Sequence, residues 1–295
     1  MSLLLAAVVH LTFQNHARRY LLHVPARLPA RAPLVLVFHG GSEPPENMEK
    51  MSRFDELADR EHFIVAYPAA VDKNWADGRG STPEEQEGID DVGFVRAVIA
   101  DIRKQHPLDD RRIFATGPSN GGIFSNRLGC EMADTFAAIG PVIGTMASNL
   151  APNCKPSQPI SVVGIQGLDD PLMPFAGGEE GGLHHLGRGG RIEGGRATQE
   201  LWARLNGCSG APSSITMLRD ADDGTRVVKR SWSRCRAGSE VAWYEIEGGG
   251  HRWPPRQGER PAVERLARKA FGVSSQNIDA TKTLWEFFKR HAKGP

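Results

Sequence analysis

The sequence lacks an apolar run long enough to cross a membrane, and it lacks an excess of charge of one sign. Its 36 lysines and arginines against 35 aspartates and glutamates leave a formal net charge of +1. With no basic excess, nothing electrostatic favours binding to nucleic acid or to an anionic membrane surface. No linker and no internal repeat is apparent either. We therefore interpret residues 1–295 as one domain with a substantial core and no separate substrate-adsorption domain.

Cysteine is scarce, and its placement limits what the four residues can do. Cys130 and Cys154 flank one segment, Cys208 and Cys235 flank another, and none forms the C-x-x-C pair typical of zinc sites. Two sequence-local disulfides would imply an oxidising compartment, and four buried free thiols in a cytosolic enzyme are the alternative. Met1–Val9 is apolar but has neither a basic start nor a clear cleavage site, so we do not interpret it as a signal peptide; a leader could have been removed.

Apolar runs alternate with amphipathic segments along most of the chain. We expect a hairpin at His10–Val24, strands at Leu34–Phe38, Phe63–Tyr67, Ile113–Ala115, Ala137–Ile143, Ile160–Ile165 and Val241–Ile246, and helices at Met48–Glu61, Asp90–His106, Ile123–Glu131, Thr198–Asn206 and Asn277–Lys289. Strands that alternate with helices through short joins are typical of an α/β fold with a doubly wound, mostly parallel sheet and helices on both faces.

The segment Gly117-Pro118-Ser119-Asn120-Gly121 matches the pattern Gly-x-Ser-x-Gly, between a predicted strand and a predicted helix. In so sharp a turn, side chains two residues from the serine would collide with neighbouring backbone, so glycine is preferred there. Such a turn holds the hydroxyl of Ser119 at the head of a helix, where free N–H groups stabilise an anion. A loop that merely joins a strand to a helix is the alternative interpretation.

Two glycine-containing segments follow other predicted strands. His39-Gly40-Gly41 comes after the first buried strand, where a backbone N–H of Gly41 can approach a reacting oxyanion. Gly248-Gly249-Gly250-His251 comes after the last strand, where the glycines allow His251 to turn over the top of the sheet. An ordinary turn and a surface histidine are the respective alternatives.

An acidic pair, Asp169-Asp170, follows the strand predicted at Ile160–Ile165. A hydrolase that uses serine, aspartate and histidine needs its orienting carboxylate at this place in the chain. Both aspartates are candidates, and Pro171 favours Asp170 because it rigidifies the chain just beyond it. A solvated acidic turn is the alternative.

Taken in order, Ser119, Asp170 and His251 predict nucleophilic catalysis of acyl transfer. Ser119 would attack the carbonyl carbon, His251 would move the proton to the leaving alcohol, and Asp170 would hold the imidazole in the required tautomer. The backbone N–H groups of Asn120 and Gly41 would stabilise the oxyanion. This chemistry requires no cofactor.

The quoted motifs together resemble those of the polyhydroxybutyrate depolymerase-like esterases, a group (carbohydrate esterase family one) that also contains feruloyl and acetyl xylan esterases. They are His39-Gly40-Gly41, Asp90-Asp91-Val92-Gly93-Phe94, Gly117-Pro118-Ser119-Asn120-Gly121-Gly122, Asp169-Asp170-Pro171 with Pro174-Phe175, Asn206-Gly207-Cys208, and Gly248-Gly249-Gly250-His251-Arg252-Trp253-Pro254. The resemblance implies an α/β-hydrolase fold and a secreted or periplasmic serine esterase. It also implies Asp170 as the acid and disulfides Cys130–Cys154 and Cys208–Cys235.

Three aromatic residues are candidates for contact with the substrate. Trp75 lies in the polar stretch Ala69–Ile89 and is either a core anchor or a wall of the substrate cleft. Phe175 stands where the resembling family frequently has tyrosine, and Trp253 belongs to the histidine motif. Pro118 also departs from the larger apolar residue expected there, and it and Phe175 would reshape the acyl pocket.

The segment Gly177–Gly195 is rich in glycine and contains the pair His184-His185. We expect it to form a mobile surface loop or a lid. A metal site there would need further ligands in defined geometry, so no metal is expected. Selectivity is expected to depend on this loop and on Ala69–Ile89.

Three functions are compatible with these motifs. The first is an esterase acting on small to medium soluble esters, including feruloyl or acetyl esters. The second is a short-chain polyhydroxyalkanoate depolymerase or oligomer hydrolase, and the third is an inactive hydrolase fold used as a binding protein. The complete series Ser119, Asp170 and His251 argues against the third, because binding alone does not need all three groups. The sequence does not indicate an oligomeric state.

Overall fold

A computed structural model of the chain describes residues 6–179, 189–217, 220–256 and 260–294. Ten strands of the described residues form one sheet with the order β1-β2-β4-β3-β5-β6-β7-β12-β11-β10. They are β1 (Ala7–Phe13), β2 (His16–His23), β3 (Ala32–Val37), β4 (Ile64–Pro68), β5 (Leu108–Pro118), β6 (Ala138–Val142), β7 (Ser161–Gly167), β10 (Ser213–Thr216), β11 (Arg226–Trp232) and β12 (Val241–Glu247). A separate two-stranded sheet pairs β8 (Gly178–Glu179) with β9 (Arg191–Ile192).

The six central strands, from β4 to β12 in the sheet order, run parallel, and the strands at both edges run antiparallel. Strands β3, β4, β6 and β7 are buried along their whole length, which explains why they read as continuous apolar runs. The mostly parallel α/β architecture is therefore confirmed. Because parallel strands end at one edge of the sheet, the segments after β3, β5, β7 and β12 meet there.

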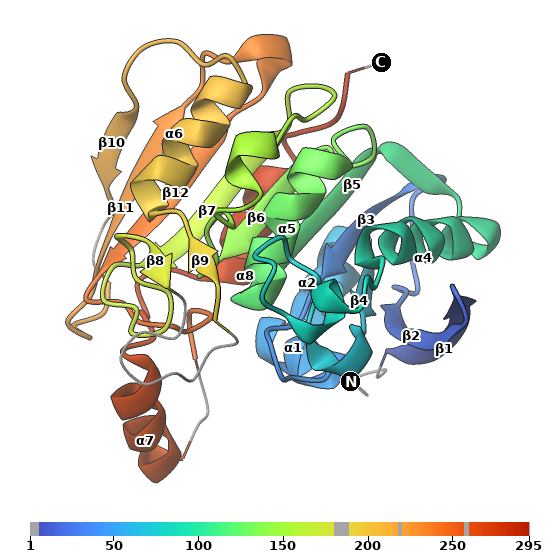
Figure 1. Ribbon diagram of the computed structural model, residues 1–295, viewed down its shortest axis with the longest axis horizontal. Coiled ribbons are helices and arrows are strands. Elements are labelled where there is room, and N and C mark those ends of the chain that lie inside the picture. The colour runs from blue at the N-terminus through green and yellow to red at the C-terminus, as the bar shows by residue number, and fades with distance from the viewer. Residues whose placement is uncertain (1–5, 180–188, 218–219, 257–259, 295) are drawn as a thin grey trace.

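Helices cover both faces of the sheet (Figure 1). Their bounds are α1 (Pro45–Ser52), α2 (Phe54–Glu61), α3 (Pro83–Gln86), α4 (Asp91–Gln105), α5 (Asn120–Glu131), α6 (Gly195–Leu205), α7 (Pro261–Phe271) and α8 (Ala280–Phe288). One core cluster contains Val98 of α4, Phe124 of α5 and Trp202 of α6. A second contains Phe54 of α2 and Leu284 of α8. Alternate residues of β3 belong to these two clusters, so they lie on opposite faces of the sheet. A third, smaller cluster contains Ile123 of α5.

The expected helix Met48–Glu61 is wrong in one respect, because the structure has two helices there. Arg53 takes a left-handed conformation, with φ 55°, that ends α1 and starts α2. Its N–H group donates a hydrogen bond to the carbonyl oxygen of Glu49, which closes the last turn of α1. The strands β10 and β11 and the helix α7 were not predicted.

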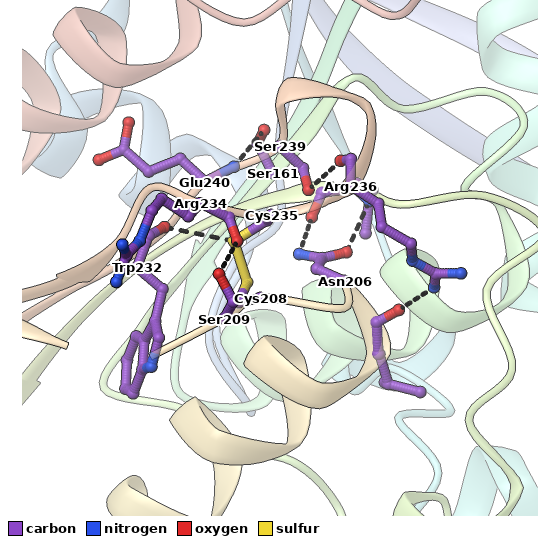
Figure 2. The surroundings of a disulfide bond; sticks show 12 residues. Ser161, Asn206, Cys208, Ser209, Trp232, Arg234, Cys235, Arg236, Ser239 and Glu240 are labelled. Carbon is purple, nitrogen blue, oxygen red and sulfur yellow. Dashed lines mark hydrogen bonds between the residues drawn. A yellow bond between two sulfur atoms is a disulfide. The ribbon is translucent and has the colours of Figure 1, made fainter. Parts of the chain in front are cut away.

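Both expected disulfides are present, and no cysteine is free. Cys130–Cys154 joins the end of α5 to the segment before β7. Cys208–Cys235 joins the chain after α6 to the chain after β11, and Figure 2 shows its polar surroundings. There Asn206 holds the backbone of Ile160, accepting from its N–H at 3.0 Å and donating to its carbonyl oxygen at 2.7 Å. Asn206 thus holds the end of α6 beside the start of β7, and the disulfide joins the same region to the chain after β11.

No helix in the described part of the chain combines the length and the apolar character needed to cross a membrane.

Candidate active site

Ser119 lies in a strained turn between β5 and α5. Its backbone has φ 56° and ψ −124°, a conformation that is rare for any residue with a side chain. The flanking glycines are required by space: a Cβ on Gly117 would lie 2.3 Å from the carbonyl oxygen of Phe38, and one on Gly121 would lie 2.4 Å from the same atom. The end of β3 therefore passes close under the turn, as the Gly-x-Ser-x-Gly pattern predicts.

An aspartate and a histidine come together from the ends of the neighbouring strands β7 and β12. Nδ1 of His251 lies 2.7 Å from Oδ2 of Asp170, whose side chain is fully buried. The other oxygen, Oδ1, accepts hydrogen bonds from the N–H groups of Leu172 and Met173, both at 2.8 Å. These bonds fix the carboxylate in one orientation. Asp169, the competing candidate, is exposed.

Ser119 and His251 line one cavity of about 570 Å³. The glycines after β3 form another part of its wall. Its remaining lining is Ser42, Glu43, Met51, Arg79, Pro118, Asn120, Ile143, Leu172, Arg252, Trp253, Arg256, Val263, Ala267 and Phe271. The cavity is thus apolar over much of its wall, with a few charged side chains. Burial raises the pKa of Glu43, an effect that Arg256 and His251 oppose.

The two predicted oxyanion donors lie beside each other at this cavity. Asn120 is the first residue of α5, so its N–H has no acceptor within the helix. Gly41 is so close that a Cβ built on it would lie 3.6 Å from Cβ of Asn120. Both residues line the cavity with Ser119. The two residues that carry the predicted donors therefore lie close to Ser119, and their role as oxyanion donors stays a prediction.

The side chain of Asn120 ties α5 to the loop 69–89. Its Oδ1 accepts from the N–H of Trp75 at 2.8 Å, and its Nδ2 donates to Oδ2 of Asp77 at 2.6 Å. Asp77 also forms a buried ion pair with Arg79, at 2.8 Å, and Arg79 lines the cavity. Sequence reasoning missed this support. The only sign of this support in the sequence is the unusual density of polar residues around Trp75.

His39 lies buried next to Gly40 and Gly41. The N–H of Ala70 donates to Nε2 of His39 at 3.1 Å, so the ring proton is on Nδ1, which donates to the carbonyl oxygen of Gly40 at 2.8 Å. Burial lowers the pKa of His39 to about 4, so the ring is neutral at pH 7. The neutral ring of His39 thus links Gly40, after β3, to Ala70 at the start of the loop 69–89.

The interpretation of Trp75 as a wall of the substrate cleft is wrong. Trp75 is fully buried, stacks on Phe124 with ring centroids 4.9 Å apart, and donates from Nε1 to the carbonyl oxygen of His39 at 3.0 Å. It is a core anchor, because both its ring and its N–H have their contacts inside the protein. Loop 69–89 therefore supports the site and contributes only Arg79 to the described cavity wall.

The other two aromatic candidates lie in different places. Phe175 is not among the described residues that line the cavity; its ring packs on Gly195 at the start of α6, where an added Cβ would lie 2.2 Å from it. Its predicted contact with substrate stays a prediction. Trp253 does line the cavity, and its Nε1 donates to Oγ1 of Thr281 at 3.2 Å.

The predicted loop Gly177–Gly195 is described only at its two ends. The pair His184-His185 lies outside the described residues, as does the part expected to act as a lid. Within the described ranges, no group of three or more histidine, cysteine, aspartate or glutamate side chains is arranged to hold a metal ion.

Comparison with known proteins identifies relatives of this chain. The family described as esterase PHB depolymerase matches residues 18–152. The chain is 31% identical over 281 residues to the putative esterase NocK of Nocardia uniformis subsp. tsuyamanensis, covering 90% of this chain and 79% of that protein. It is 29% identical over 228 residues to feruloyl esterase B of Piromyces equi, covering 75% of this chain and 39% of the relative.

Solved structures resemble the fold at low sequence identity. An acetyl xylan esterase from Aspergillus awamori matches with a TM-score of 0.59 and 13% identity, covering 85% of this chain and 96% of that one. A thermostable esterase matches with a TM-score of 0.56 and 15% identity, covering 97% of this chain and 63% of the other. With the identity to NocK, these findings show that the chain belongs to the esterase PHB depolymerase family and is a carboxylic-ester hydrolase of the α/β-hydrolase fold.

Proposed function

We propose that the protein hydrolyses small to medium soluble carboxylic esters through an acyl-enzyme formed on Ser119. The observation that carries the proposal is the pairing of His251 with the buried carboxylate of Asp170 at 2.7 Å, in a histidine that lines the same cavity as Ser119. A serine in a strained turn, a histidine and a fixed carboxylate are the groups that acyl transfer requires.

In the proposed reaction, Ser119 Oγ attacks the ester carbonyl carbon while Nε2 of His251 accepts the hydroxyl proton. Collapse of the tetrahedral intermediate breaks the bond to the alcohol oxygen, and His251 donates the proton to it. A water molecule then attacks the acyl-enzyme with His251 again as the base. Asp170 stabilises the imidazolium through Oδ2, while the two backbone hydrogen bonds hold its other oxygen.

The N–H groups of Gly41 and Asn120 are the proposed oxyanion donors. Loss of one such donor typically raises the barrier by about 3 kcal/mol. The loop 69–89 connects the two donors, because Asn120 bonds Trp75 and Asp77 of this loop and the N–H of Ser42, next to Gly41, donates to the carbonyl oxygen of Lys73 at 2.9 Å. No step of the proposed reaction uses a metal or an organic cofactor.

The cavity supports a substrate of modest size. Its volume of about 570 Å³ is within the ordinary range of small-molecule sites, and feruloyl and acetyl esters would fit such a volume. Trp253 and Pro118 are the proposed acyl-pocket contacts among the predicted residues, since both line this cavity. We treat the ten-stranded sheet and its helices as one catalytic domain.

We also propose that the protein acts in a secreted or periplasmic location. The two disulfides support this, because such bonds persist in oxidising compartments. Labelling of free thiols on the protein isolated from its native host would test the proposal. Four unreactive cysteines are expected, and four reactive ones would contradict it.

The test of activity uses p-nitrophenyl esters from acetate to decanoate, methyl ferulate, and a soluble hydroxybutyrate oligomer. We expect the wild type to hydrolyse short p-nitrophenyl esters and the variant Ser119→Ala to lose that activity while keeping its thermal unfolding midpoint. Preference for the oligomer over all other esters would instead favour the depolymerase. A folded wild type that turns over none of these esters would overturn the proposal and favour a binding protein.

A further inference from the structure

Helix α7 stands apart from the helices that cover the sheet (Figure 1). None of its residues is buried, and it carries the exposed side chains Val263 and Leu266, at 50% and 69% exposure. Val263, Ala267 and Phe271 recur every four residues, so they follow one side of the helix. These three residues line the cavity that contains Ser119. α7 therefore presents an apolar side to the proposed active site without being part of the core.

The end of α7 is fixed to the loop that carries His251. The N–H of His251 donates to the carbonyl oxygen of Phe271 at 2.6 Å, and the N–H of Gly250 donates to that of Val273 at 2.9 Å. Gly250 packs so closely here that an added Cβ would lie 2.1 Å from the carbonyl oxygen of Phe271. This contact explains why the residue before His251 is glycine.

A second attachment lies nearer the start of the helix. Nη2 of Arg252 donates to Oε2 of Glu264 at 2.8 Å, and the side chain of Arg252 is only 3% exposed. The residue next to His251 thus holds the first turn of α7, while the N–H of His251 itself holds the last residue. The two attachments give α7 a defined place beside the histidine although its own side chains bury little surface.

We propose that α7 is the wall of the cavity that selects the alcohol part of the ester, and that it favours an apolar alcohol. This inference rests on the proposed function. His251 must donate its proton to the alcohol oxygen, so the group attached to that oxygen leaves the serine on the side of His251. α7 is bonded to the loop of His251 and offers Val263, Ala267 and Phe271 on that side.

Two series of substrates test which part of the ester meets α7. The alcohol series runs from methyl acetate to hexyl acetate, and the acyl series runs from methyl acetate to methyl hexanoate. Full burial of one methylene favours binding by up to about fourfold. In the wild type we therefore expect kcat/KM to rise along the alcohol series.

The variants Val263→Ser and Phe271→Ala remove apolar surface from the cavity side of α7. We expect each to lower the ratio of kcat/KM for hexyl acetate over methyl acetate about tenfold, the effect of losing contact with roughly two methylenes. Leu266→Ser is the matched control, because Leu266 is on the same helix and more exposed but does not line the described cavity. It should keep the wild-type ratio. Because no residue of α7 is buried, all three variants should unfold at the wild-type temperature.

The outcomes separate this inference from the function on which it rests. Unchanged ratios in both cavity-side variants would overturn the role of α7, and so would an equal effect of Leu266→Ser. A change confined to the acyl series would mean that α7 contacts the acyl part of the ester and not the alcohol part, which would also overturn the proposal. If Ser119→Ala retains the wild-type rate, the proposed nucleophile fails, whereas the ratios measured with α7 variants still test the cavity wall. Absence of any ester turnover would refute both.

Discussion

Acidification is expected to destabilise the protein through one buried histidine, His39. Its side chain has both ring nitrogens engaged, Nδ1 with the carbonyl oxygen of Gly40 and Nε2 with the N–H of Ala70. A second proton on Nε2 would face an N–H donor and would put a charge where the residue is only 1% exposed. Burial therefore lowers the pKa of His39 from 6.5 to about 4.

The size and sign of the effect follow from this difference in pKa. Between pH 6.5 and about 4 the unfolded chain binds a proton at this position that the folded chain does not. The free energy of unfolding therefore falls as the pH falls through this range, and the full contribution of His39 is present only above pH 6.5. At about 1.4 kcal/mol per unit of pKa, the loss amounts to about 3 kcal/mol.

Other groups titrate in the same range, so the wild-type curve alone does not isolate His39. Burial raises the pKa of Asp55 to about 6, which makes the folded state bind a proton more tightly and acts in the opposite direction. The assay therefore compares the wild type with His39→Gln, whose neutral amide can both donate and accept. Urea unfolding is measured at intervals from pH 4 to pH 7 with the disulfides intact.

We expect the difference in unfolding free energy between the two proteins to depend on pH. The wild type should lose about 3 kcal/mol more than His39→Gln between pH 7 and pH 4, whatever the constant cost of the substitution. Parallel curves would refute the reasoning, because they would mean that His39 titrates alike in the folded and unfolded chains. The contact of the His39 ring with Trp75, at 5.0 Å between centroids, affects only the constant offset.

Three further substitutions test the proposed catalytic acid, one disulfide and the turn that carries Ser119. Asp170→Asn should lower kcat for p-nitrophenyl acetate by about 10³- to 10⁴-fold. The control Asp169→Asn, at the exposed neighbouring residue, should change kcat less than about twofold. Equal effects of the two variants would contradict the assignment of Asp170 as the acid. Replacing Cys208 and Cys235 together by serine should lower the free energy of unfolding by about 3 kcal/mol in urea, and an unchanged midpoint would show that this bond does not stabilise the fold. Gly121→Ala would put Cβ 2.4 Å from a backbone carbonyl oxygen, so we expect both a lower thermal midpoint and loss of activity, and wild-type values for both would contradict the steric argument.

The candidate catalytic residues lie in short segments with distinctive local patterns, so the local sequence is enough to propose them. A glycine-flanked serine between a strand and a helix has few backbone conformations available, and Ser119 has the strained one that the pattern predicts. The order of Ser119, Asp170 and His251 then needs only a parallel sheet to bring their loops to one edge. The choice of Asp170 over Asp169 also depended on a local feature, the following proline, together with the family resemblance.

The loop 69–89 was harder to interpret because its role depends on partners distant in the sequence. Trp75 stacks on Phe124, and Asp77 binds Asn120, more than 40 residues further along the chain. A single tryptophan among polar residues is compatible with a cleft wall or with a core anchor. Only the contacts with α5 decide between them. The polar residues here satisfy buried donors and acceptors, a function that composition alone does not distinguish from solvation.

The role of helix α7 as a wall of the cavity could not be predicted from the sequence either. The spacing of Val263, Ala267 and Phe271 is visible in the sequence, but an apolar stripe normally indicates the side of a helix that packs on the core. Here the stripe stays largely unburied, because the helix is held at its end by the N–H of His251 and at its start by Arg252. Those attachments turn an apolar side toward the cavity. A sequence pattern can therefore predict that such a side exists, whereas its role depends on which loop the helix is fastened to.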